Sequence, residues 1–220
     1  MAHILFHIEG CNFGATLYDT GDLSTIRGAS RAYLQIPKLW PSLLAPTLGK
    51  IETVVVGASD GIYRAETEAT AERFTELLGA AIQNAGGSGA ANLIPYLSFT
   101  YAAVAESTNY KDHIRRLVAL CRSRQLQQLS VDVPPLADGA TKPCPVDRKR
   151  PASTPYDMPD GQQDVSLSVA KRREYGRTTG SRLYKDELGP DDAIEVIDSF
   201  QDLVTDYRHT VSTPKCNKRA

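Results

Sequence analysis

The sequence lacks a long apolar run and lacks paired cysteines, and each absence excludes a class of protein. None of its 220 residues lies in a stretch near the ~18 consecutive apolar residues that a membrane span needs. The N-terminus has no basic region before its short apolar run, so a secretory signal is not predicted. The four cysteines form no Cys-x-x-Cys pair, which argues against a disulfide framework or a zinc site of paired thiols. We therefore expect a cytoplasmic protein with reduced thiols.

Common catalytic and nucleotide-binding motifs are also missing. The sequence contains no phosphate-binding P-loop, no Gly-x-Gly-x-x-Gly fingerprint and no recognisable order of serine, histidine and aspartate. His3 and His7 fall on the same side of the first expected strand, which favours a place in a sheet over metal binding. His113 and His209 have no partner at a ligand spacing.

The formal net charge is only −1, but the charges are distributed unevenly. Residues 1–110 carry 6 basic and 10 acidic side chains, whereas residues 142–185 carry 10 basic and 5 acidic ones. A basic segment inside a near-neutral chain indicates a local partner, rather than the general nucleic-acid affinity of a basic protein.

Residues 1–110 alternate strand and helix signals. We expect a strand at 2–8, a helix from Asp22 or Ser24 to Ile36, strands at 51–57 and 62–66, a helix at 68–85 and a strand at 96–106. Pro37 is expected to end the first helix, and Thr67 to cap the second. This order, βαββαβ, predicts an α+β, ferredoxin-like domain with one antiparallel sheet and helices on one face.

Residues 111–220 are predicted to form a helical and basic extension. The expected elements are a helix at 110–128 with Ile114, Leu117, Val118 and Cys121 inward, a strand at 129–133, a long proline-rich loop at 134–164, a basic segment with tyrosines, and an amphipathic helix at 191–207.

Two acids are candidates for a metal and nucleotide site. In a ferredoxin-like sheet the end of the first strand lies beside the tip of the central hairpin, which places Glu9 near Asp60. Two carboxylates there suit Mg²⁺. Backbone amides in the flanking turns "EGCNFG" and "GASDG" would hold the phosphates of ATP, through Asn12, Gly57, Ser59 and Gly61. The alternative is that Asp60 only forms the turn and Glu9 only ends a strand.

Two segments resemble a known family. "DTGDLSTIRGAS" (19–30), followed by the hairpin "VVVGASDGIYRA" (54–65), is similar to the palm domains of the large subunit of type III CRISPR effector complexes. In that family the catalytic palms carry a Gly-Gly-acid-acid hairpin turn and convert ATP to cyclic oligonucleotides with two metal ions. The non-catalytic palms keep the fold and lose the acids. Here the tetrad falls on Ala58-Ser59-Asp60-Gly61, where only Asp60 is an acid, and Glu9 stands at the acid after the first strand.

The resemblance implies a non-catalytic or weakly nucleotide-binding palm-like subunit of an RNA-guided defence complex. Its partners would be other subunits of the complex and RNA, and it would have no membrane partner. An alternative is a Mg²⁺-dependent palm cyclase or polymerase that uses ATP, with a homodimer through the palm as one arrangement. A third function, nucleotide binding without turnover, also stays open.

The segment "KPCPVDRKRPA" (142–152) resembles the family's zinc-binding cysteine pair with its following Arg-Pro-Ala stretch. Cys144 stands at the first ligand position, but Asp147 stands at the second. Since one cysteine does not complete a tetrahedral site, we expect no structural zinc and a vestigial loop.

The basic segment is a candidate for RNA contact. Its cations would neutralise phosphates, and Tyr175 or Tyr184 would stack on a base. The alternative is a solvated face, or internal pairing with Glu174 and the acidic C-terminal helix. The candidate cations are Arg148, Lys149, Arg150, Lys171, Arg172, Arg173, Arg177 and Arg182.

Overall fold

A computed structural model describes residues 2–106, 109–127, 142–158 and 161–188. Met1–Gly176 form one compact unit, and a second unit begins at Arg177. The first unit thus continues past residue 110, where the sequence had suggested a boundary. The expected strand at 129–133 and the expected helix at 191–207 lie outside the described residues. No helix in the described part of the chain is both long and apolar enough to span a bilayer.

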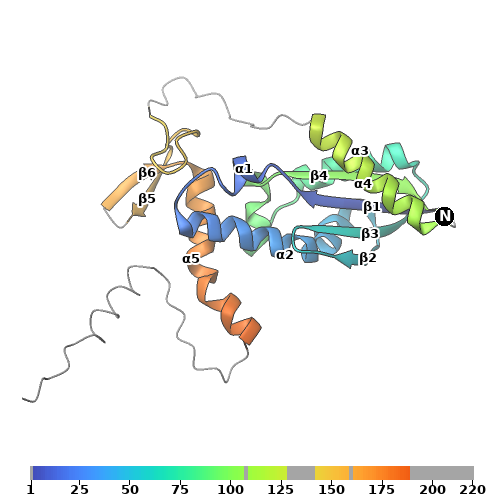
Figure 1. Cartoon of the computed structure of the whole chain (residues 1–220), viewed down its shortest axis with the longest axis horizontal. Helices are drawn as coiled ribbons and strands as arrows, with labels where there is room; N and C mark the ends of the chain where they lie inside the picture. Colours follow the sequence, from blue (N-terminus) through green and yellow to red (C-terminus); the bar gives the residue numbers. More distant parts are fainter. Residues whose placement is uncertain (1, 107–108, 128–141, 159–160, 189–220) are drawn as a thin grey trace, which may run out of the picture. The chain divides into compact units, whose positions relative to one another are not determined.

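The first unit is built around a four-stranded antiparallel sheet (Figure 1). Its strands are β1 (Ala2–Gly10), β2 (Ile51–Val56), β3 (Asp60–Thr67) and β4 (Phe99–Ala105), in the order β2-β3-β1-β4. β1 is therefore central and pairs with both β3 and β4. The mixed α+β class with an antiparallel sheet, predicted from the sequence, is confirmed.

Helices cover both faces of this sheet. Ile4, Phe6 and Ile8 of β1 belong to the larger hydrophobic core, which also takes in buried side chains of α2 (Leu23–Leu48) and α3 (Ala71–Asn84). On the other face, Leu5 packs in a smaller core with Cys121 of α4 (Tyr110–Gln127). α2 and α3 share one face, as expected. The expectation that helices cover only one face is wrong, because α4 packs on the other.

α2 does not end at Pro37, as the sequence had suggested, and this prediction was wrong. The helix runs on through Pro37, Pro41 and Pro46 to Leu48. Pro41 has no N–H to donate to the carbonyl of Pro37 four residues earlier. The hydroxyl of Tyr63 in β3 donates to that carbonyl at 2.5 Å and takes the place of the missing amide. Burial of α2 residues such as Trp40 adds core packing that local helix propensity does not report.

Two smaller expectations also change. Thr70, and not Thr67, is the N-cap of α3, where its side chain accepts a hydrogen bond from the amide of Arg73 at 3.3 Å. In α4, Leu117 and Cys121 are buried as expected, but Val118 is 41% exposed.

The expected loop at 134–164 is wrong for its described part. Thr154–Met158 (β5) and Gly161–Val165 (β6) form an antiparallel hairpin, which leads directly into α5 (Leu167–Leu188). Two short elements complete the description, α1 (Phe13–Thr16) after β1 and the 3₁₀ helix η1 (Gly89–Tyr96) before β4.

The hydrogen bond from Tyr63 to Pro37 is open to a direct test. Tyr63→Phe leaves the ring in place and the Pro37 carbonyl without its donor, so we expect the free energy of unfolding to fall by about 1–3 kcal/mol. Urea denaturation followed by circular dichroism measures it. Tyr18→Phe, at a side chain that is 69% exposed, is the control and should leave the midpoint unchanged. Equal midpoints for both variants would contradict this role of the hydroxyl.

Candidate functional site

The two candidate acids are neighbours across the β1–β3 ladder. Glu9 lies directly opposite Asp60 in the antiparallel register. The amide of Gly10 donates to the carbonyl of Ser59 at 2.8 Å, which ties the hairpin turn to the end of β1. The structure thus brings Glu9 and Asp60 together as the sequence predicted.

Each carboxylate already has a cationic or hydrogen-bonding neighbour. Oε1 of Glu9 lies 2.9 Å from a guanidinium nitrogen of Arg122 in α4. Oδ2 of Asp60 lies 3.4 Å from Nε2 of the buried His7, and the Asp60 side chain remains 45% exposed. Among the described residues, no group of three or more His, Cys, Asp or Glu side chains is arranged to hold a metal ion.

The turn itself is built closely around Asp60. The amide of Gly57 donates to the backbone carbonyl of Asp60 at 2.9 Å. A Cβ at Gly57 would stand 2.2 Å from Oδ1 of Asp60, so glycine leaves room for the carboxylate. Asp60 therefore has a role in the turn whether or not it also meets a ligand.

Several cations of the basic segment are internal. Arg172 and Arg173 are buried, and Arg150 is mostly so, each in an ion pair with an aspartate. These three are therefore corrected from candidate RNA contacts to structural residues. Tyr175 is buried as well, and its hydroxyl donates to Gln35 of α2 at 2.5 Å.

The other candidate cations whose side chains the structure describes lie nearer the surface. Arg148, Lys149 and Arg177 are exposed, and Lys171 is half-buried beside Glu174 at 3.8 Å. The side chain of Arg182 lies outside the described residues.

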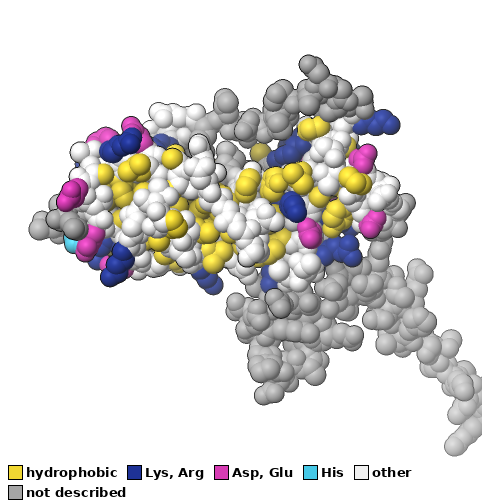
Figure 2. Space-filling view, turned by 180° about the vertical axis from the view of Figure 1, so that it is seen from behind, with side chains coloured by type: hydrophobic (Ala, Val, Ile, Leu, Met, Phe, Trp, Pro, Cys, Tyr) yellow, Lys and Arg dark blue, Asp and Glu magenta, His cyan; other side chains and the backbone are white. Residues whose placement is uncertain are grey.

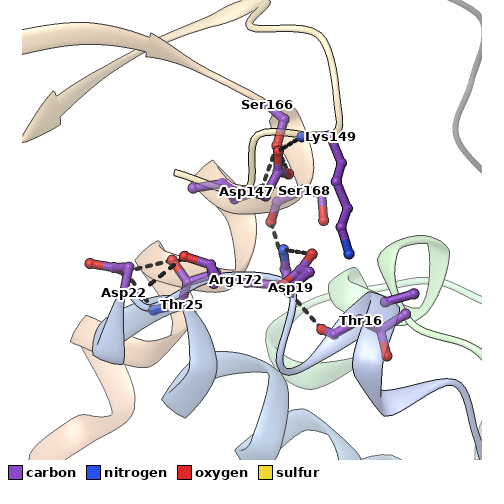
Figure 3. Close-up of polar contacts among 12 residues, drawn as sticks. Thr16, Asp19, Asp22, Thr25, Asp147, Lys149, Ser166, Ser168 and Arg172 are labelled. Atoms are coloured by element: carbon purple, nitrogen blue, oxygen red, sulfur yellow. Dashed lines mark hydrogen bonds and ion pairs between the residues drawn. The ribbon is translucent and has the colours of Figure 1, made fainter. Parts of the chain in front are cut away.

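Asp19 is the centre of a buried ion-pair network (Figure 3). Arg172 of α5 binds both carboxylate oxygens of Asp19, each at 2.9 Å, and donates to the carbonyl of Thr16 at 2.5 Å. Arg150 binds the same carboxylate at 2.6 Å and also reaches Asp147 at 3.0 Å. We call Asp19, Asp147, Arg150 and Arg172 the Asp19 network. It connects the segment after β1 to residues 142–172.

Asp147 holds the loop that the sequence compared with a zinc site. Its carboxylate accepts from the amides of Lys149 and Arg150 at 3.0 and 3.1 Å, and from the hydroxyl of Ser166 at 2.9 Å. Cys144 is buried in an apolar cluster with Val169 and neighbouring residues. In this loop a carboxylate and its donors organise the turn, and the cysteine packs as a small apolar side chain.

Burial and hydrogen bonding oppose each other at both aspartates. Burial alone would raise the pKa of Asp19, but the hydrogen bonds and charges of Arg172 and Arg150 outweigh it and hold this pKa below its usual range. Burial also acts to raise the pKa of Asp147, and its amide, Arg150 and Ser166 donors again lower it. Both groups are therefore carboxylates at neutral pH.

α2 and α5 are in backbone contact next to this network. A Cβ at Gly28 would lie 1.8 Å from the carbonyl oxygen of Arg172, and one at Gly176 would lie 2.0 Å from the carbonyl oxygen of Ser24. Gly28 belongs to the "IRGAS" part of the segment that carried the resemblance. Its absent side chain is what lets α5 reach α2.

A pocket of about 740 Å³ lies beside the Asp19 network. It is lined by the segment after β1, the C-terminal half of α3, η1, the start of β4, the segment around Arg150 and the first residues of α5. Asn12, a candidate residue, lines it and donates to Ser98 at 3.2 Å. Neither Glu9 nor Asp60 is among its lining residues.

No model of a known protein family matches the sequence, and no curated protein matches it either.

Asp19→Asn tests the network. The variant leaves Arg172 and Arg150 short of a counter-charge, so we expect unfolding to cost about 3–5 kcal/mol less at neutral pH. Because the pKa of Asp19 is lowered in the folded state, its contribution is present above the unfolded-state pKa of about 3.9 and is lost as pH falls through the folded-state value. Denaturant titrations at several pH values should therefore show a weaker acid dependence in Asp19→Asn than in the parent protein.

The matched control is Asp157→Asn, at an exposed position of β5. It should leave both the stability and its pH dependence unchanged. An Asp19→Asn variant as stable as this control would contradict the role given to the network.

Proposed function

We propose that the chain is a non-catalytic, palm-like subunit of an RNA-guided antiviral defence complex of the type III CRISPR kind, with at most weak nucleotide binding. Its fold would then be ferredoxin-like. The strand order β2-β3-β1-β4 supports this, because a split βαβ arrangement produces that order. The segments that carry the resemblance form the turn before α2 with its first two helical turns, and the β2–β3 hairpin.

The ion pair between Arg122 and Glu9 is the observation that carries the proposal. Phosphoryl transfer by two metal ions requires carboxylates that bind both ions. At this end of the sheet Glu9 is neutralised by Arg122 of α4, and Gly61 stands where the catalytic hairpin would have its second acid. Asp60 alone does not supply enough oxygen ligands for two divalent ions.

A Mg²⁺-dependent palm cyclase or polymerase is the second candidate function. The cross-strand position of Glu9 and Asp60 and the exposure of the Asp60 carboxylate favour it. Glu9 would first have to leave Arg122, whose side chain is 55% exposed and also donates to Gln125 at 2.7 Å. Mg²⁺ and ATP are the cofactors in this case.

RNA contact is the proposed binding role within such a complex. The supporting cations are those left at the surface of the first unit, Arg148, Lys149 and Lys171. On the face shown in Figure 2, Lys and Arg side chains are interspersed with Asp and Glu, which suits contact with a few phosphates rather than with a long duplex. Partner subunits and a cytoplasmic location are part of the same proposal.

Incubation with ATP and Mg²⁺ or Mn²⁺ separates the two functions. We expect anion-exchange chromatography and mass spectrometry to show no oligonucleotide product, because Glu9 and Asp60 supply too few oxygen ligands for two metal ions. Arg122→Gln, which releases Glu9, should also give none. A product that the parent chain forms and the Asp60→Ala variant does not would contradict the non-catalytic role and support the cyclase.

RNA contact is tested by changing Arg148, Lys149 and Lys171 together to glutamine. We expect weaker binding of single-stranded RNA, because about three phosphate contacts are removed, and a slope of log affinity against log salt that is smaller by about 2. Fluorescence anisotropy with a labelled RNA at several salt concentrations measures both quantities.

The control removes the same charge elsewhere. Lys111, Arg115 and Arg116 are exposed on α4, and their joint change to glutamine should leave the salt slope nearly unchanged. Equal losses in both triple variants would mean that general charge, and not the three proposed cations, determines the affinity.

A further inference from the structure

The pocket beside the Asp19 network has a helix N-terminus in its wall. α5 begins at Leu167, and Ser166, Leu167 and Ser168 all line the pocket. Ser166 accepts a hydrogen bond from the amide of Val169 at 3.3 Å through its hydroxyl and so caps the helix. The amides of Leu167 and Ser168 belong to the first turn and have no carbonyl of their own helix to bond. They give this end of the helix a partial positive charge.

The hydroxyl of Ser168 is the independent sign of a missing ligand. Ser168 is only 4% exposed, and its Oγ has no hydrogen-bond partner among the described residues. A buried hydroxyl without a partner costs free energy, so native proteins rarely leave one in that state. Ser168 also lines the pocket, so a group bound there lies beside the residue that carries this hydroxyl and beside the first turn of α5.

Charge decides which kind of group fits. The two aspartates of the Asp19 network are balanced by Arg150 and Arg172, which bind them directly. The field that remains at the pocket comes from the N-terminus of α5. The exposed Lys149 is not among the lining residues, but it adds a positive charge next to Arg150, which is. Figure 3 shows the Lys149 side chain extended, with no dashed contact at its amine. These contributions are positive and favour an anion over a cation.

Other lining residues of the pocket are suited to a flat ring. Tyr96 and Tyr101 are half-buried and line it, and Gln83 adds an amide. Aromatic side chains stack on planar rings, and the volume of about 740 Å³ is larger than a phosphate ion needs and within the usual range for small-molecule sites.

We infer that this pocket binds a small phosphorylated molecule that carries a flat ring, of the nucleoside monophosphate class. Its phosphate accepts hydrogen bonds from the amides of Leu167 and Ser168 and from the Ser168 hydroxyl. Its ring lies against Tyr96 and Tyr101. The inference is independent of the proposed function, because Glu9 and Asp60 do not line this pocket.

Isothermal titration calorimetry on the full chain with AMP, inorganic phosphate and adenosine tests the inference. We expect AMP to bind more tightly than phosphate, and adenosine to bind more weakly than AMP. Ser168→Ala removes one donor, and Ser168→Asp adds a negative charge that suits the first turn of a helix but repels phosphate. Ser168→Asp should weaken AMP binding by about tenfold or more.

Ser123→Asp, at an exposed position of α4, makes the same charge change elsewhere and should leave AMP affinity unchanged. If Ser168→Asp fails to fold, Ser168→Ala is the test, and we expect it to lower AMP affinity several-fold. No AMP binding at millimolar concentration would overturn the inference, as would AMP affinity unchanged in both Ser168 variants. Adenosine binding as tight as AMP would overturn the phosphate assignment, and phosphate binding as tight as AMP would overturn the ring contact.

Discussion

The buried contact between Asp19 and Arg172 is the interaction on which the rest of the first unit depends. Both side chains are fully buried, and two charges removed from water are tolerated only with close pairing and full hydrogen bonding. Arg172 meets that condition through both carboxylate oxygens and the Thr16 carbonyl. Arg150 extends the contact to Asp147, so the segment between α1 and α2, the loop at 142–152 and the start of α5 form one connected structure.

The same connection explains how a loop without paired cysteines keeps a defined turn. Asp147 collects four hydrogen-bond donors, among them the guanidinium of Arg150 and the Ser166 hydroxyl at the start of α5. A carboxylate in this setting does what a bound metal does elsewhere, since it fixes several donors around one centre. α5 is then held against α2 where Gly28 and Gly176 allow the two backbones to touch.

The two candidate sites lie at different places in the first unit. At the hairpin, neutralisation of Glu9 by Arg122 favours a binding role over phosphoryl transfer. At the start of α5, the Ser168 hydroxyl, buried and without a partner among the described residues, and the first amides of the helix favour an anionic ligand. The network lies beside the second site and holds the start of α5, so the geometry of that pocket depends on these ion pairs as well as on the sheet strand β4 that lines it.

The sequence by itself determined the order of the four sheet strands with α2 and α3, and the meeting of Glu9 with Asp60. Alternation and turn residues are local signals, and the pairing of strands follows from their order. The length of α2, the pairing of Glu9 with Arg122 and the burial of Arg150, Arg172 and Arg173 were decided only by the tertiary structure. Asp19 and Arg172 stand 153 residues apart, so no local pattern marks them as partners. A run of arginines has the same sequence whether it faces solvent or a buried aspartate, and only folding supplies the counter-charge that distinguishes the two.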